Sequence, residues 1–214
     1  MSSPPAEAPI SVMLVDDHLL VRRGFRRMLE DDPGIRVVAE AGDGQEAVDA
    51  ALRERPAVIV MDFALPNMNG ALATRKIIAQ APEIAILILS MHSEASYVRT
   101  CLDAGARGYL LKNAMDLELV EAVKNVAAGQ TVLDPRLALQ TKGPVAPIPT
   151  LSARELEVLQ LIVNGKSNKD IAVMLKLSAN TVSVHRANIM QALDIHNTAD
   201  LVVYAIRNGL VSIA

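Results

Sequence analysis

Short apolar runs alternate with amphipathic stretches over the first 128 residues. Five runs are rich in Val, Ile and Leu, and each is followed by a stretch with apolar positions at helical spacing. The pattern predicts strands at Ile10–Val15, Ile35–Ala41, Ala57–Met61, Ile84–Leu89 and Gly108–Leu111, and helices at His18–Glu30, Gln45–Glu54, Gly70–Gln80, Glu94–Ala104 and Asp116–Ala128. Five successive βα units indicate an α/β domain with a parallel sheet covered on both faces, because each crossover returns to the same end of the sheet.

The pattern changes after residue 131. Residues 134–150 hold four prolines and a glycine, which disfavour a helix and favour an extended spacer. A docking motif at Pro144 to Pro147 is an alternative use of the same prolines. We therefore divide the chain into an α/β domain at 8–130, a linker at 131–149 and a second domain at 150–214.

The second domain is predicted to contain four helices and no strands. Ser152 with Glu155 and Ser167 with Asp170 fit the spacing of a capping box, in which two residues satisfy each other's free backbone amides at a helix start. A third helix begins near Ser178, and a fourth spans 199–208. The short connections at 165–167 and 177–179 are typical of a helix-turn-helix, in which the later helix enters the major groove of DNA.

Composition and charge narrow the choice of partners. Hydrophobic residues make up 51% of the chain and aromatic residues only 2%, as expected for parallel strands covered by helices. No apolar run is long enough to cross a bilayer, and Met1 to Pro9 do not resemble a signal peptide, so we expect a cytoplasmic protein.

The net charge of the chain is −3. Residues 148–214 carry 6 basic and 5 acidic side chains, so this half is the better candidate for binding a polyanion. Cys101 is alone and is expected to be a buried apolar residue.

Charged and hydroxyl side chains follow four of the predicted strands. Asp16 and Asp17 follow the first strand, Asp62 follows the third, Ser90 follows the fourth and Lys112 follows the fifth. Ligands of an open parallel sheet bind beyond the carboxyl ends of its strands. Three carboxylates gathered there would repel one another unless a hard divalent cation lay between them, and oxygen ligands suit Mg²⁺.

These groups together predict phosphoryl chemistry. Asp62 can attack phosphorus and form an acyl phosphate, while Mg²⁺ and the Lys112 ammonium stabilise the transferring oxygens. Ser90 would donate its hydroxyl to a phosphate oxygen. Taken singly, the Asp pair is more often a helix cap and the Lys is more often a solvated side chain. Their order at the ends of successive strands favours the functional interpretation.

Residues 10 to 128 resemble the receiver domain of two-component response regulators. The resemblance is carried by the motifs Val15-Asp16-Asp17-His18, Met61-Asp62-Phe63-Ala64-Leu65-Pro66, Leu89-Ser90 and Gly108-Tyr109-Leu110-Leu111-Lys112. It implies a doubly wound five-stranded sheet of order 2-1-3-4-5, with Asp62 as the phospho-acceptor. It also implies that Asp17, Asp62 and the backbone carbonyl of Ala64 bind Mg²⁺, that Asp16 acts through metal-bound water, and that Tyr109 is a switch residue. Because Ala64 cannot orient a hydrolytic water, we expect slow loss of the phosphoryl group, which a comparison with Ala64→Asn tests.

The second domain resembles the LuxR-type helix-turn-helix, and the whole chain is similar to the NarL/FixJ family over residues 8–212. The motifs are Leu151-Ser-Ala-Arg-Glu155, Asn164-Gly-Lys-Ser-Asn-Lys-Asp-Ile-Ala172 and Asn180-Thr-Val-Ser-Val-His-Arg186. Spacing and resemblance place Ser183, Val184 and Ala187 against bases and Lys169, Thr181 and Arg186 against phosphates. Relatives often carry Lys where this chain has Ser183 and Ala187, so a single domain should bind weakly. Pairing is expected through Val202, Tyr204 and Ile206, although these residues are equally suited to the core.

The resemblance implies a DNA-binding transcription regulator that accepts a phosphoryl group on Asp62 from a sensor histidine kinase. Phosphorylation would promote formation of a homodimer and binding to promoter DNA. The only catalysis expected is Mg²⁺-dependent self-phosphorylation and slow autodephosphorylation. One alternative is a phosphatase or phosphotransferase, which would turn over a small substrate steadily. The other is an interaction module whose helical domain does not bind DNA, which a salt-dependent band shift would exclude.

Overall fold

The computed structural model describes residues 8–66, 68–112, 116–137, 151–207 and 210–211. The side chains of residues 116, 117 and 207 are outside this description. The predicted linker therefore lies mostly outside the described residues. None of the helices in the described ranges combines the length and the apolar character needed to cross a bilayer.

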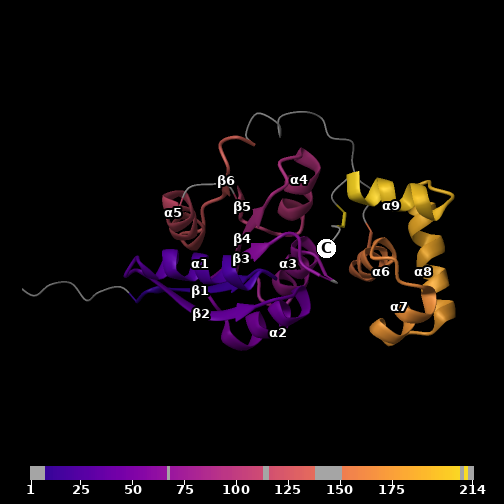
Figure 1. Ribbon diagram of the computed structural model, residues 1–214, viewed down its shortest axis with the longest axis horizontal. Coiled ribbons are helices and arrows are strands. Elements are labelled where there is room, and N and C mark those ends of the chain that lie inside the picture. The colour runs from indigo at the N-terminus through magenta and orange to yellow at the C-terminus, as the bar shows by residue number, and fades with distance from the viewer. Residues whose placement is uncertain (1–7, 67, 113–115, 138–150, 208–209, 212–214) are drawn as a thin grey trace, which may run out of the picture.

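A parallel sheet of order β2-β1-β3-β4-β5-β6 forms the first domain (Figure 1). Its strands are β1 Ile10–Val15, β2 Ile35–Ala41, β3 Val58–Asp62, β4 Ala85–Ser90, β5 Gly108–Leu111 and β6 Val132–Leu133. The fold class and the order of the first five strands are confirmed. The sheet is one strand wider than predicted, because Val132 and Leu133 pair with Gly108 and Tyr109 although the sequence pattern placed them in the linker.

Five helices cover the two faces of this sheet. They are α1 Leu19–Glu30, α2 Gly44–Glu54, α3 Gly70–Ile78, α4 Ala95–Asp103 and α5 Asp116–Ala127. Alternate strand residues enter opposite cores, because successive side chains of a strand point to opposite faces. Val12 and Leu14 pack in the core beneath α1 and α5, whereas Met13 and Val15 pack in the core that holds buried residues of α2, α3 and α4.

The second domain is helical in the described residues, as predicted. Its helices are α6 Ala153–Val163, α7 Asn168–Leu175, α8 Ala179–Ala192 and α9 Thr198–Arg207. Both predicted capping boxes are present, at Ser152 with Glu155 and at Ser167 with Asp170. Gly165, in the short connection between α6 and α7, has a φ of +73°, a conformation that a residue without Cβ adopts with little strain.

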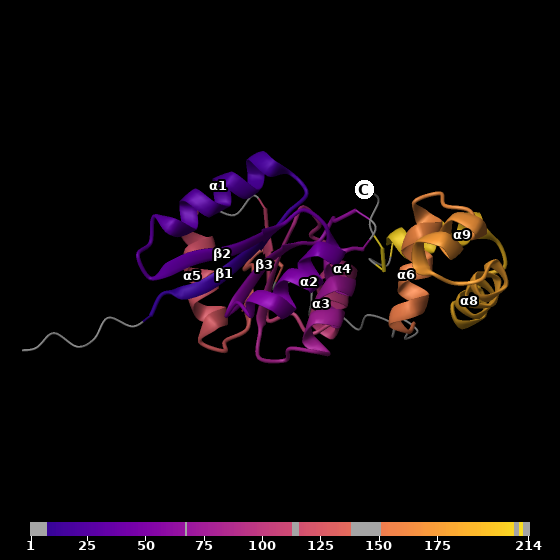
Figure 2. The ribbon, with the colours of Figure 1, turned by 90° about the horizontal axis from the view of Figure 1, so that it is seen from below.

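The two domains pack against each other through α3 and α6 (Figures 1 and 2). The apolar core on the α2–α4 side of the sheet is continuous with the core of the helical domain. Helix α8 lies on the side of the helical domain that faces away from the first domain in both views. The packing of the two domains therefore leaves α8 uncovered.

Candidate functional site

Three acidic residues meet at the carboxyl edge of the sheet, as the strand order requires. Asp62 is the last residue of β3 and Asp16 follows β1, and each is only 3% exposed. Asp17 is next to Asp16 and more exposed, with a side chain that is 32% accessible. One ligand atom from each of these acids and from His18 lies within 4.8 Å of all the others. The cluster is partly open to solvent and suits a metal ion with oxygen ligands.

Lys112 joins two of these acids. Its Nζ lies 2.8 Å from Asp16 Oδ2 and 2.7 Å from Asp62 Oδ2, and its side chain is 15% exposed. The Lys112 amide donates to the Ser90 carbonyl at 2.8 Å, which fixes the backbone from which the side chain extends. The ammonium thus neutralises part of the negative charge at the edge of the sheet.

Burial and charge act against each other on the pKa values here. Burial raises the pKa of Asp62, and the nearby charge of Asp16 adds to this effect, whereas Lys112 opposes it. For Lys112, burial favours the neutral amine, but the charges of Asp62 and Asp16 outweigh burial and raise its pKa. The lysine therefore remains a cation at neutral pH, as stabilisation of phosphoryl oxygens requires.

The loop between β3 and α3, which we call the acceptor loop after the predicted acceptor Asp62, holds the Asp62 carboxylate in place. The amide of Ala64 donates to Asp62 Oδ1 at 3.2 Å, so each carboxylate oxygen of Asp62 has a bonding partner. Gly70, the first residue of α3, lies against the backbone of this loop. A Cβ at Gly70 would lie 2.3 Å from the Asp62 carbonyl oxygen, so only glycine fits without a shift of the acceptor backbone.

The predicted switch residues lie next to this edge. Ser90 is 1% exposed and its Oγ accepts from the His92 amide at 3.0 Å. Tyr109 is fully buried, and its hydroxyl donates to the His92 carbonyl at 2.8 Å. Both residues therefore hold the same short loop between β4 and α4. Burial raises the pKa of Tyr109, so this hydroxyl remains a donor at neutral pH.

An aromatic group that the sequence pattern did not reveal links this loop to the second domain. The His92 ring stacks on Tyr97 with a centroid distance of 4.2 Å and an interplanar angle of 8°. Phe63, the neighbour of the acceptor, meets Tyr97 edge-on at 5.1 Å. The Tyr97 hydroxyl donates to the carbonyl of Ile206 on α9 at 2.9 Å. A short path of contacts therefore runs from the acceptor loop to the last helix.

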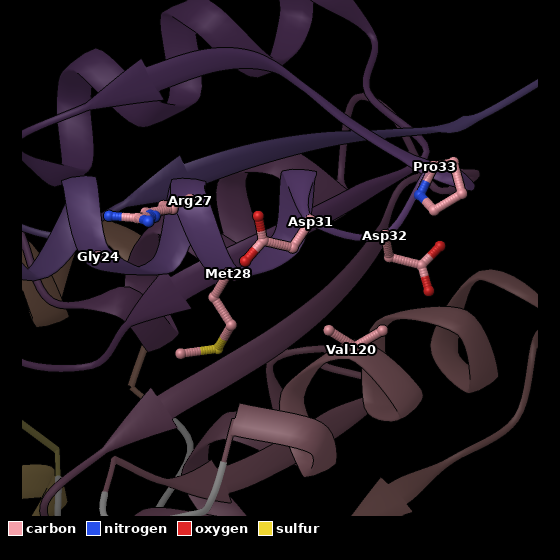
Figure 3. Close-up of a pocket in the computed structure, with 7 residues that line it drawn as sticks. All are labelled: Gly24, Arg27, Met28, Asp31, Asp32, Pro33 and Val120. Carbon is pink, nitrogen blue, oxygen red and sulfur yellow. The ribbon is translucent and has the colours of Figure 1, made fainter.

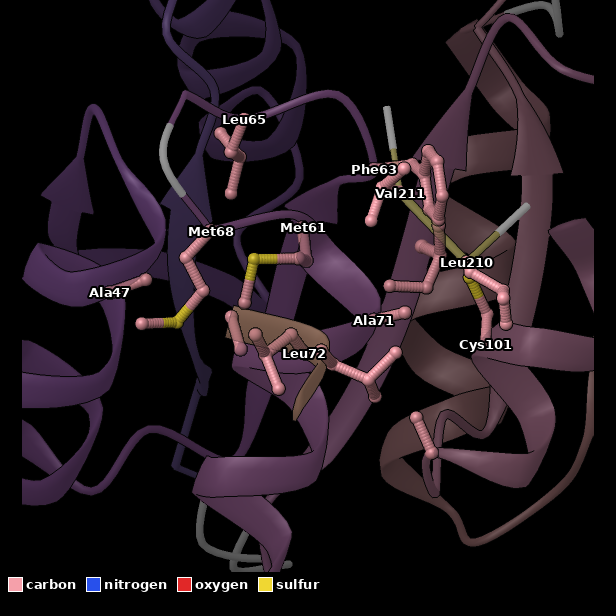
Figure 4. Packing of buried hydrophobic residues seen from close by; sticks show 14 of the residues in the cluster. Ala47, Met61, Phe63, Leu65, Met68, Ala71, Leu72, Cys101, Leu210 and Val211 are labelled. Atoms are coloured by element: carbon pink, nitrogen blue, oxygen red, sulfur yellow. The ribbon is translucent and has the colours of Figure 1, made fainter. Parts of the chain in front are cut away.

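The chain after α9 returns to the acceptor loop. Leu210 and Val211 are buried beside Phe63 and Cys101 of the first domain (Figure 4). The side chain of Asn69, the N-cap of α3, donates to the Leu210 carbonyl at 3.1 Å and accepts from the Leu72 amide. The acceptor loop thus contacts the C-terminal part of the helical domain directly. Cys101 is fully buried, as predicted.

An ionic contact joins α3 to α6 farther from the acceptor. Lys76 pairs with Glu157, whose other carboxylate oxygen accepts from Arg154 at 2.5 Å. Burial alone would raise the pKa of Glu157, but hydrogen bonds from Lys76 and Arg154 outweigh burial and lower it. Glu157 is therefore charged at neutral pH and bridges the two domains. Arg75 adds a bond of 3.2 Å to the Leu151 carbonyl.

The residues proposed to contact DNA bases lie on or near the outward face of α8. Val184 is 52% exposed, and Ser183 and Ala187 are also exposed. The Ser183 hydroxyl donates to the Ala179 carbonyl at 3.1 Å and accepts from Asn168 of α7. These three positions therefore present only small side chains to a partner.

The side chains proposed to contact phosphates differ in the bonds that they already make within the domain. Lys169 is exposed on α7. The Thr181 hydroxyl is 2.8 Å from the hydroxyl of Ser178 at the helix start. The Arg186 guanidinium donates to Asn168 at 3.1 Å and to Thr198 at 2.9 Å, so it ties α8 to α7 and α9. Arg186 would have to share or exchange these bonds to reach a phosphate.

The residues proposed for pairing lie on α9. Val202, Tyr204 and Ile206 are partly buried and pack against the shared core. Val203, between them, is 47% exposed. The face of α9 that is open to a partner is therefore centred nearer Val203 than the sequence pattern indicated.

A cavity of about 530 Å³ lies elsewhere, between α1 and α5 (Figure 3). Its lining residues are Gly24, Arg27, Met28, Asp31, Asp32, Pro33 and Val120. Asp31 and Asp32 follow the C-terminal end of α1, whereas the acidic cluster precedes the N-terminal end of that helix. The cavity is thus at the opposite end of α1 from Asp62 and is separate from the acidic cluster.

Both domains match known families. Residues 12–124 match the response regulator receiver domain, and residues 149–205 match the bacterial regulatory proteins of the luxR family. The chain is 38% identical to "Oxygen regulatory protein NreC" of Staphylococcus carnosus, over 94% of this chain and 99% of that protein.

Solved structures with both domains are also similar. The response regulator ChrA of a heme-sensing two-component system is 35% identical, with a TM-score of 0.54, and the match covers 95% of this chain and 99% of that one. RcsB, in a structure of two dimers bound to two parallel DNAs, is 25% identical, with a TM-score of 0.59, and the match covers 92% of this chain and 97% of that one.

A receiver domain joined to a LuxR-type helix-turn-helix domain defines a DNA-binding response regulator. The chain belongs to the NarL/FixJ family of these regulators, as the sequence motifs indicated.

Proposed function

We propose that Asp62 of this response regulator is phosphorylated by a sensor histidine kinase and that phosphorylation controls promoter binding by the helical domain. The observation that carries the proposal is the position of Asp62 Oδ2, 2.7 Å from Lys112 Nζ and within a cluster of ligand atoms that fits a metal ion. An isolated buried acid would be destabilised by its charge, but here the charge is balanced by a cation.

In the proposed reaction an Asp62 oxygen forms a bond to phosphorus while the donor's bond to phosphorus breaks, and the donor keeps the electron pair. Asp17, Asp62 and the Ala64 carbonyl would hold Mg²⁺, with Asp16 acting through water, and the ion would supply charge stabilisation. Lys112 would stay close to the transferred oxygens, and the Ser90 hydroxyl would donate to one of them. The protein's own part is thus to orient Asp62 and to offset charge.

The path from Ser90 and Tyr109 through His92 to Tyr97 supports a link between the acceptor and the helical domain. A phosphate oxygen that accepts from the Ser90 hydroxyl would draw Oγ toward Asp62 and away from the His92 amide, which now donates to it at 3.0 Å. Movement of His92 would disturb its stack on Tyr97 and hence the bond to Ile206. Loss of this contact would free α9 for pairing, and we infer a homodimer when Asp62 is phosphorylated.

Promoter binding is assigned to the outward side of α8 together with Lys169 of α7. The proposed contacts are Lys169, Thr181, Ser183, Val184, Arg186 and Ala187. The similar protein RcsB is bound to DNA in a solved structure, which supports DNA binding by this chain. Since the helical half is nearly neutral, two copies of the domain are needed for firm binding. A promoter partner also implies a cytoplasmic location.

The decisive experiment loads the full chain with beryllofluoride and Mg²⁺ as a phosphoryl mimic. We expect loading to raise both the dimer fraction in sedimentation and the affinity for promoter DNA in a band shift. Asp62→Asn is the matched control, because it keeps the side-chain volume and removes the acceptor charge. If loading changes neither quantity in the wild type, phosphorylation is not the switch. Steady turnover of a phosphodonor without DNA binding would favour the enzyme alternative.

A further inference from the structure

Arg22, one turn into α1, reaches back to the acidic edge of the sheet. Its Nη1 donates to the backbone carbonyl of Asp16, and its Nε donates to Glu40 Oε2 on β2 at 2.9 Å. The Arg22 side chain is 15% exposed and that of Glu40 is 25% exposed. The guanidinium is therefore held between the ends of β1 and β2, which lie at the same edge of the sheet as Asp62.

The carbonyl that Arg22 holds belongs to the peptide between Asp16 and Asp17. The orientation of this peptide plane fixes the backbone from which Asp17 projects, because a peptide unit is rigid. Asp17 is the most exposed acid of the cluster. It lies in the turn that joins β1 to α1. An anchor on this peptide thus restricts the backbone of the least buried of the three acids, whose side chain otherwise contacts the exposed His18.

Glu40 in turn keeps Arg22 in position. Its second oxygen, Oε1, accepts from Arg26 Nη1 at 2.8 Å, one turn farther along α1. Burial alone would raise the pKa of Glu40, but bonds from Arg26 and Arg22 outweigh it and lower the pKa, so Glu40 stays charged at neutral pH. Of these two arginines, Arg22 donates to the Asp16 backbone, whereas in the described residues Arg26 donates only to carboxylates.

We propose that Arg22, anchored by Glu40, is a positioning residue that sets the Asp16–Asp17 peptide for Mg²⁺ binding. The inference deepens the proposed function and rests on it, since it assumes that Asp17 and Asp62 bind the ion. A planar guanidinium suits this role because it bonds a carbonyl and a carboxylate at fixed angles.

Charge and position predict opposite effects of neutralising Arg22. A positive charge close to a cation site weakens binding, so its removal should tighten binding if charge alone matters. If position matters, loss of Arg22 should weaken binding although a repelling charge has been removed. Groups that orient metal ligands typically alter metal affinity about tenfold or more when they are replaced.

The experiment measures the dissociation constant of Mn²⁺ for the full chain, from the electron paramagnetic resonance signal of the ion that stays free in solution. A second titration then measures how Mg²⁺ displaces the bound Mn²⁺. We expect Arg22→Gln to raise the dissociation constant about tenfold. We expect Arg22→Lys, which keeps the positive charge but loses the planar guanidinium, also to raise the dissociation constant. Arg26→Gln is the matched control, since it removes the same charge and a bond to the same Glu40, and it should leave the constant unchanged or slightly lower.

Each result decides the question. Tighter binding by Arg22→Gln with unchanged binding by Arg22→Lys would mean that Arg22 acts only through charge, and would overturn the inference. If Arg22→Gln and Arg22→Lys both bind Mn²⁺ as the wild type does but melt at a lower temperature, Arg22 only stabilises the fold, and the inference is wrong. If Arg22→Gln does not fold, the Arg22→Lys result stands on its own. Wild-type protein that binds no better than Asp62→Asn would instead contradict the proposed metal site itself.

Discussion

The acidic edge of the receiver and the outward face of α8 hold their polar groups in opposite ways. At the edge, Asp16 and Asp62 are buried, and the half-buried Lys112 bonds both of them. On α8, Val184 is 52% exposed, while Arg186 bonds residues of its own domain. The receiver site is thus assembled by folding, whereas at the proposed DNA face Arg186 would have to exchange its present bonds before it could contact a partner.

Replacing Lys112 with Met should have the largest effect. The change leaves Asp16 and Asp62 facing each other in a buried site without a cation, and breaking such a pair typically costs about 3–5 kcal/mol. We expect a loss of this size in the free energy of unfolding in metal-free buffer, measured by urea denaturation. Added Mg²⁺ should restore more stability to this variant than to the wild type.

The second variant Asp16→Asn tests the cause of that loss. In the Lys112→Met background it removes one of the two facing charges, so it should recover part of the stability that the first substitution lost. If the double variant is less stable than the wild type by the sum of the two single losses, repulsion between the two acids is not the reason.

The contrast between the two regions also explains how far the sequence could be interpreted. Asp62 and Lys112 were predicted because the ends of parallel strands meet at one edge, so order along the chain fixes neighbours in space. The path through His92 and Tyr97 was missed, since stacking joins a loop to a helix without any sequence periodicity. The bond from Asn69 to Leu210 spans 141 positions and depends on how two domains pack, which no local pattern encodes.

Local side-chain bonds limited the prediction for α8. Ser183 and Ala187, predicted to face bases, lie on an exposed face of the helix. Spacing on a helix did not reveal that Arg186 bonds Thr198, because that contact joins two helices whose crossing follows from core packing. The sixth strand was missed for a related reason, since two residues are too short a run to show alternation.

Replacing Arg186 with Gln should have the next largest effect, and on a different quantity. We expect promoter affinity to fall about tenfold and the slope of log affinity against log salt to shrink by about 1, if the guanidinium exchanges its present bonds for a phosphate. Lys169→Gln is the control. It removes the same charge and a proposed phosphate contact at an exposed position, but it leaves the bonds of Arg186 between the helices intact.

The two variants separate the roles of Arg186. A stability loss in Arg186→Gln that exceeds that of Lys169→Gln reports the bonds to Asn168 and Thr198, each worth about 0.5–1.5 kcal/mol. An unchanged salt slope for Arg186→Gln, measured by fluorescence polarisation from low to high salt, would show that this side chain remains bound to its own domain in the complex.

Replacing Tyr97 with Phe should have the smallest effect of the three, and it tests whether the two regions communicate. The change keeps the stack on His92 and removes only the hydroxyl that donates to Ile206, a bond worth about 0.5–1.5 kcal/mol. We expect the amides of α9 to exchange hydrogen up to about tenfold faster, with those of α8 unchanged. Tyr97→Ala, which also removes the ring, should accelerate α9 further. Equal exchange of the α9 amides in the wild type and both variants would mean that the acceptor loop does not restrain the last helix through Tyr97. The proposed link from Asp62 to the helical domain would then have to run through the contacts of Asn69 and Glu157.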